Sequence, residues 1–116
     1  MRYSELQFGS QELKLRLAAS NTIALEKQLG GRSPLDVLLG MERGEMVSVT
    51  NLLTILHAAS QKFQHGVSMQ KIMDLYDEYV ESGNTYTDLL PALLDVLRVS
   101  GFFKEAPTTE PETTIQ

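Results

Sequence analysis

The first seventeen residues alternate apolar and polar side chains, a period of two that predicts strands with one buried face. The segment Gly9-Ser10-Gln11 interrupts the alternation and predicts the connecting turn. An isolated hairpin is only marginally stable in water, so we expect its apolar face to pack on the segments that follow. The apolar members of the pattern are Leu6, Phe8, Leu13, Leu15 and Leu17.

Beyond Leu17 the apolar positions recur with the 3.6-residue period of amphipathic helices, and capping residues and glycines divide them into five segments. The predicted starts are Ser20 or Asn21, Ser33-Pro34, Ser48 or Thr50, Ser68, and Thr87. The predicted ends are Gly30-Gly31, Gly40 or Gly44, Gly66 (after an apolar face that reaches Phe63), Gly83-Asn84, and Gly101.

These elements predict an α+β, mainly α fold: an N-terminal β-hairpin, about five helices and a disordered C-terminal tail. A chain of 116 residues is the size of one domain, and we place that domain at residues 1–103. Residues 104–116 are rich in Thr, Glu and Pro, with one large apolar residue, which predicts disorder. The expected core contains Leu13, Leu15, Leu17, Leu56, Leu75, Leu93 and Leu97.

The fourth predicted helix has the clearest division into two faces. At 100° per residue its apolar side collects Met69, Ile72, Met73, Leu75, Tyr76, Tyr79 and Val80. Its other side collects Asp74, Asp77, Glu78 and Glu81, which we interpret as a solvated face rather than a cation site, because no ion-wrapping loop accompanies them.

Charge and composition narrow the function. The net charge is −5 and no basic patch compensates it, which argues against binding to nucleic acid or to anionic membranes. No apolar stretch is long enough to span a membrane, and no signal-peptide pattern opens the chain. The absence of cysteine excludes disulfides, so we expect a cytosolic protein.

The chain shows no pattern for catalysis. His57 and His65 would lie about 12 Å apart along one helix, too far to share a metal ion. The common nucleophile, phosphate-binding and zinc motifs are missing. We therefore expect a protein that is not an enzyme, with no catalytic residues, no metal and no cofactor.

Candidate partner-binding residues are the apolar side chains that are adaptable or hard to bury. Met73, Tyr76 and Tyr79 fall on one helix face, where core packing and an adaptable surface for an apolar client are both open interpretations. Phe102 and Phe103 are adjacent at the edge of the predicted tail, so both rings cannot easily be buried. They suit contact with a partner or with another copy of the chain.

Several strings also resemble a known family, the tail assembly chaperones of siphophages and prophages of Gram-positive bacteria. The similar strings are LKLRL at 13–17, TIALEKQLG at 22–30, SPL at 33–35, LLTILHA at 52–58, LYDEY at 75–79 and VSGFF at 99–103. The resemblance covers roughly residues 3 to 103 and implies a helper protein of the bacterial host cytoplasm that is absent from the finished virion.

The resemblance also implies partners. Such a chaperone binds the long, helical tape measure protein, keeps it soluble and helps recruit the major tail-tube protein. Apart from the resemblance, we expect a homo-oligomer, because the chain has more apolar helical surface than a thin domain can easily cover. Many are also made in a longer form by ribosomal frameshifting, and the residues Gly101, Phe102 and Phe103 can be encoded by a slippery uridine run that would permit it. The alternative is a small acidic helical regulator, similar to an anti-repressor or antitoxin, that binds one folded partner.

Overall fold

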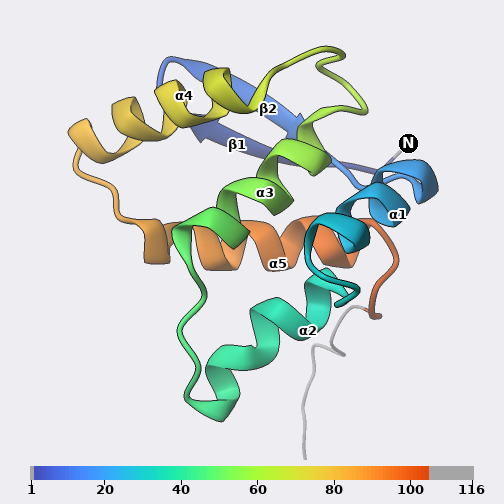
Figure 1. Cartoon of the computed structure of the whole chain (residues 1–116). Helices are drawn as coiled ribbons and strands as arrows, with labels where there is room; N and C mark the ends of the chain where they lie inside the picture. Colours follow the sequence, from blue (N-terminus) through green and yellow to red (C-terminus); the bar gives the residue numbers. More distant parts are fainter. Residues whose placement is uncertain (1, 105–116) are drawn as a thin grey trace, which may run out of the picture.

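The computed structural model describes residues 2–104, which form a two-stranded antiparallel hairpin followed by α-helices and two short 3₁₀ turns (Figure 1). The predicted order of hairpin and then five α-helices is confirmed, while the predicted disordered tail lies almost wholly outside the described residues. The strands are β1 (Ser4–Phe8) and β2 (Gln11–Leu15). The helices are α1 (Ala19–Gln28), α2 (Pro34–Leu39), η1 (Gly40–Arg43), α3 (Val49–Ser60), α4 (Met69–Glu81), η2 (Tyr86–Asp88) and α5 (Leu89–Val99).

The hairpin turn is docked on α4. Gly9 has a positive φ of 62° in the two-residue loop between the strands, a conformation that glycine adopts without steric cost. The next residue, Ser10, donates its backbone N–H to the Glu78 carboxylate at 2.7 Å. A hydrogen bond from the Ser10 side chain, and then the one from its backbone N–H, lower the pKa of Glu78. These contacts fix the tip of the hairpin against the helix.

The outer edge of β2 is closed by the end of α3 and the turn after it. The side-chain amide of Gln64 accepts from the Lys14 N–H and donates to the Lys14 carbonyl, both at 2.9 Å, as a neighbouring strand would. The Arg16 N–H donates to the Ala59 carbonyl at 3.0 Å. The third helix therefore ends at Ser60, and the prediction that it continues through Phe63 is wrong, because the chain turns to cover this edge.

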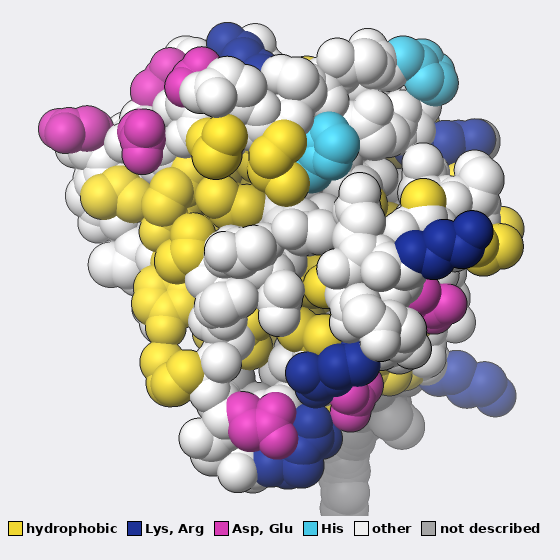
Figure 2. Space-filling model, viewed as in Figure 1, with side chains coloured by type: hydrophobic (Ala, Val, Ile, Leu, Met, Phe, Trp, Pro, Cys, Tyr) yellow, Lys and Arg dark blue, Asp and Glu magenta, His cyan; other side chains and the backbone are white. Residues whose placement is uncertain are grey.

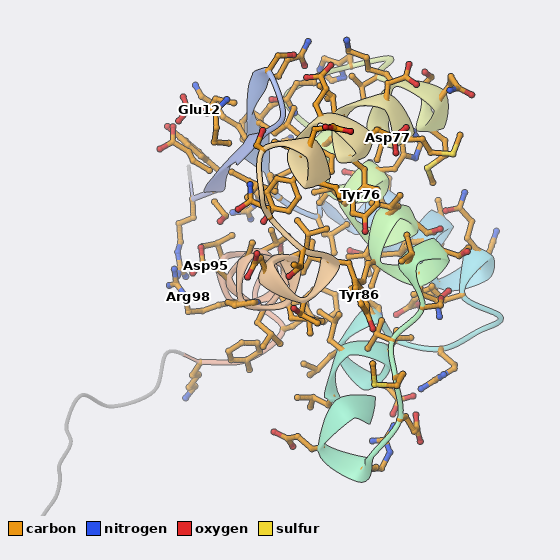
Figure 3. All side chains as sticks on the ribbon, turned by 90° about the vertical axis from the view of Figure 1, so that its left-hand side faces the viewer. Glu12, Tyr76, Asp77, Tyr86, Asp95 and Arg98 are labelled. Atoms are coloured by element: carbon orange, nitrogen blue, oxygen red, sulfur yellow. The ribbon has the colours of Figure 1, made fainter. Side chains whose placement is uncertain are left out.

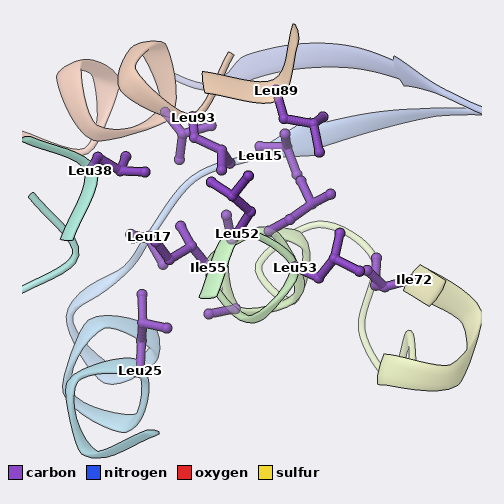
Figure 4. Close-up of a cluster of buried hydrophobic side chains, with 14 of the residues drawn as sticks. Leu15, Leu17, Leu25, Leu38, Leu52, Leu53, Ile55, Ile72, Leu89 and Leu93 are labelled. Carbon is purple, nitrogen blue, oxygen red and sulfur yellow. The ribbon is translucent and has the colours of Figure 1, made fainter. Parts of the chain in front are cut away.

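Helix α3 lies at the centre of the core and contacts α1, α4, α5 and β2. Figure 4 shows side chains of α3 surrounded by leucines from β2, α1, α2 and α5 and by an isoleucine from α4. The seven residues predicted for the core are all buried, which confirms that set: Leu13, Leu15, Leu17, Leu56, Leu75, Leu93 and Leu97.

Three of the predicted helix starts are confirmed by side-chain caps. Ser33 accepts from the Leu35 N–H at 3.2 Å, with Pro34 in the first turn. Ser48 and Ser68 each accept a backbone N–H from the third residue beyond them, at 3.0 Å in both cases. Each serine satisfies one of the free donors at a helix N-terminus.

The other two predicted starts are wrong. Helix α1 is capped at Ala18, not Ser20 or Asn21, and the Asn21 side chain reaches back to accept from the Ala18 N–H at 3.3 Å. Before α5, the chain forms η2 instead of a cap at Thr87: the Thr85 N–H donates to the Asp88 carboxylate at 2.8 Å. In both places the capping carboxylate or amide lies three residues inside the turn, as in a capping box.

A small polar cluster ties the start of the hairpin to α5. The Ser4 hydroxyl donates to Asp95 at 2.7 Å, and the Arg98 guanidinium contacts the other carboxylate oxygen at 2.6 Å. Partial burial raises the pKa of Asp95, but these two donors outweigh it and the net pKa lies below its usual value. The cluster therefore favours the charged carboxylate.

Candidate protein-binding surfaces

The two phenylalanines at the end of α5 lie in different environments. Gly101, with a φ of 88°, donates its N–H to the Arg98 carbonyl, and Phe102 donates to the Leu97 carbonyl at 3.0 Å. This pair of bonds is a Schellman motif, in which the residue after the glycine folds back on the helix. Phe102 accordingly packs against the core, while the Phe103 side chain is 40% exposed.

Phe103 forms one end of an apolar groove between α2 and α5, which we call the α2–α5 groove. Near Phe103 the groove is an open hollow of about 490 Å³, walled by Leu35 and Leu39 of α2 and by Leu94 of α5. A second hollow continues it and shares Leu39 and Leu94. The residues that line only this second part are Leu38, Glu42, Thr87, Leu90 and Pro91.

Leucine pairs four residues apart form the two walls of this groove. Leu35 and Leu39 are partly buried on α2, and Leu90 and Leu94 are partly buried on α5. Residues four apart lie one above the other on a helix, so each wall is a short apolar ridge. The arrangement offers a concave, apolar surface of the kind that accepts the apolar face of a partner helix.

Ion pairs on the polar side of α2 fix the helix to the segment after it. Asp36 contacts Arg32 at 2.8 Å and Arg43 at 3.3 Å, and Arg43 also contacts Glu45 at 3.3 Å. The hydrogen bond from Arg32, followed by the charges of both arginines, lowers the pKa of Asp36. These charges are exposed and contribute little to stability. Asp36 is the single charged residue of α2, so the leucine side of this helix carries no charge.

A second apolar depression lies between α3 and α4, and we call it the methionine hollow. It is lined by Val49, Thr50, Leu53, Thr54, Met69 and Met73. In Figure 2 a band of hydrophobic side chains runs from α4 down to the loop before α3, with acidic side chains above it. Met46 in that loop and Val80 on α4 are also exposed.

The five residues predicted to bind a partner lie in different environments. Met73 is 41% exposed in the methionine hollow, and Phe103 ends the α2–α5 groove. Tyr76 is partly buried on α4 and packs against the core (Figure 3). Phe102 is packed against the core. The structure therefore does not bring the five together into one surface.

The prediction that Tyr79 contacts a partner is wrong, because Tyr79 is only 6% exposed. Its ring packs against Phe8 of β1 at a centroid distance of 5.2 Å. Burial, and then the nearby charge of Asp88, raises the pKa of Tyr79. The buried stripe of α4 is centred on Ile72, Leu75 and Tyr79, so Val80, predicted on the apolar side, lies beyond its edge and is 45% exposed.

Two polar side chains of α3 and the turn after it, His57 and Gln61, share one backbone acceptor. His57 contacts the Val67 carbonyl at 2.9 Å, and Gln61 donates to the same oxygen at 2.7 Å, which ties down the turn after α3. Within residues 2–104 no group of three or more His, Asp or Glu could hold a metal ion. In the same part of the chain no helix is long and apolar enough to cross a membrane.

The fold and these surfaces define a small α+β protein with two open apolar depressions on separate helix pairs. Residues 3–115 match a family of unknown function, DUF6096, and the chain belongs to that family. Neither the curated proteins nor the solved structures include a match to this chain.

Proposed function

We propose that this protein is a binding chaperone that holds apolar helical segments of a client protein in the α2–α5 groove. The observation that carries the proposal is the groove itself, whose section at Phe103 is lined only by apolar side chains. Burial of such side chains by a partner helix is favourable by about 25 cal/mol for each Å² of apolar surface removed from water. An amphipathic helix with apolar positions at i, i+3, i+4 and i+7 matches the two leucine ridges.

The resemblance of the sequence to tail assembly chaperones supplies the identity of the client. In this proposal the client is a phage tape measure protein, which is long and helical, and the major tail-tube protein is a second partner. The protein acts in the cytoplasm of the bacterial host and leaves before the virion is complete. The net charge of −5 supports this role, because an acidic surface keeps a complex with an apolar client in solution.

Coexpression with a phage tape measure protein tests the proposal. The soluble fraction of the client should rise with the wild-type protein and fall back with Phe103→Asp, which places a charge in the groove. Ile23→Asp is a matched control, because Ile23 is 57% exposed on α1 and lies outside the groove.

A client that stays insoluble with the folded wild-type protein would contradict the proposal. That result, together with tight binding to one folded protein, would favour the helical regulator instead. Circular dichroism of each variant establishes that the fold survives the substitution.

A further inference from the structure

The methionine hollow is a second apolar depression, separate from the α2–α5 groove, and the charge around it has one sign. Its floor is formed by Leu53 of α3, and its sides include Val49 of α3 and Met69 and Met73 of α4. Unbranched thioether side chains adapt to irregular apolar partners more easily than branched ones. The shape and chemistry therefore suit the apolar face of a helix or a similar ridge.

One side of the hollow is bordered by negative charge. Asp74 follows Met73 directly, and Asp77 and Glu81 lie one and two turns further along α4. All three side chains are exposed, and within the described part of the chain none of them forms an ion pair with Lys or Arg. We call these three residues the acidic ridge.

The helices that form the hollow carry little positive charge. Helix α3 contains no Lys or Arg, and α4 has one lysine, Lys71, which lies one turn before Asp74 and forms no ion pair with the acidic ridge within the described residues. Figure 3 places Asp77 on the outer side of α4, beside Tyr76. An apolar surface with a rim of one sign selects partners of the opposite sign.

We propose that the methionine hollow binds an amphipathic helix of another protein, whose apolar face fills the hollow and whose polar face carries Lys or Arg against the acidic ridge. A second copy of this chain fits poorly, because its net charge is also −5. The C-terminal residues 105–116 fit poorly too, since they contain three Glu and no Lys or Arg.

A synthetic helical peptide provides the probe. It has 18 residues, with Leu at i, i+3, i+4 and i+7 spacing and Lys at the other positions, and carries a fluorescent label for anisotropy. A second peptide has the same leucines with Glu in place of Lys. Because the same leucine spacing also suits the α2–α5 groove, the readout is the difference between the two peptides. The Lys peptide should bind the full-length protein more tightly than the Glu peptide at low salt, and the difference should shrink as salt screens the ridge.

Two sets of substitutions with the same change in net charge separate the ridge from general attraction. The ridge set is Asp74→Asn, Asp77→Asn and Glu81→Gln. The control set, on the hairpin and α1, is Glu5→Gln, Glu12→Gln and Glu26→Gln. The ridge set should weaken binding of the Lys peptide about tenfold at low salt, because each exposed charge contributes a small part of the attraction. The control set should change it much less.

Substitutions at the two apolar surfaces separate this proposal from the proposed function. Met73→Ala should weaken binding of the Lys peptide, because it removes apolar contact in the hollow. Phe103→Asp should leave the preference for the Lys peptide over the Glu peptide unchanged while abolishing the effect on client solubility. Failure of one surface can thus be distinguished from failure of the other.

Three results would overturn the assignment. The first is equal binding of the Lys peptide and the Glu peptide at low salt. The control set would weaken binding as much as the ridge set, which would mean attraction to net charge alone. The third is dimerisation of the protein by itself, abolished by Met73→Ala in sedimentation, which would make a second copy the occupant.

Discussion

Substitution of Gly9 by alanine should lower the unfolding free energy for two reasons, a strained backbone conformation and a steric collision with α4. A side chain at Gly9 must adopt a φ of 62°, and its Cβ would lie 2.8 Å from the Leu75 carbonyl oxygen and from the Glu78 Cβ. A left-handed conformation costs an L-residue about 1–2 kcal/mol. The collision adds about 1–3 kcal/mol, the usual range for overpacking, because a backbone oxygen of α4 cannot rotate away.

Gly30 is the matched control, because its φ is 72° and no atom lies within 4 Å of a Cβ built on it. Gly30→Ala therefore carries the conformational cost alone. Urea unfolding should show a larger loss of unfolding free energy for Gly9→Ala, by about 1–3 kcal/mol. In a domain of this size each kcal/mol lowers Tm by about 4–8 °C. Equal losses for the two variants would show that the turn does not dock on α4.

Two further predictions concern the core and the polar cluster. Leu56→Ala should lower the unfolding free energy by about 2–5 kcal/mol, because Leu56 is fully buried; a loss below 1 kcal/mol in urea unfolding would place it outside a packed core. Asp95→Asn should destabilise the protein at neutral pH, with a difference from wild type that is fully present above the ordinary pKa of 3.8. Because the folded-state pKa is lowered, that difference should shrink as the pH falls through the folded value, and a pH-independent difference in unfolding free energy would contradict it.

The sequence predicted the fold well because local patterns determine most of it. The period-two alternation located both strands, and Ser33, Ser48 and Ser68 each mark a helix start through a cap that needs no distant partner. The starts of α1 and α5 were missed because the capping side chain lies three residues after the first residue of the turn. The end of α3 was missed because Gln64 bonds to β2, a contact between residues 50 apart in the sequence.

The binding surfaces could be predicted only in part. Local composition identified Met73 and Phe103 as exposed apolar candidates, and both line open hollows. The leucine walls of the α2–α5 groove have the same spacing as core leucines, so only the packing of α2 beside α5 shows that they stay half exposed. Tyr79 was misassigned for the converse reason, since its burial depends on Phe8 of the hairpin.

Site-specific photocrosslinking tests the central claim that the α2–α5 groove holds client helices. A photoreactive phenylalanine analogue replaces Phe103 in one variant and Ile23 in another, and each is irradiated in complex with the tape measure protein. We predict crosslinks from position 103, mapped by mass spectrometry to apolar helical segments of the client, and few from position 23. Crosslinks that are absent at position 103, or equal at the two positions, would contradict the account.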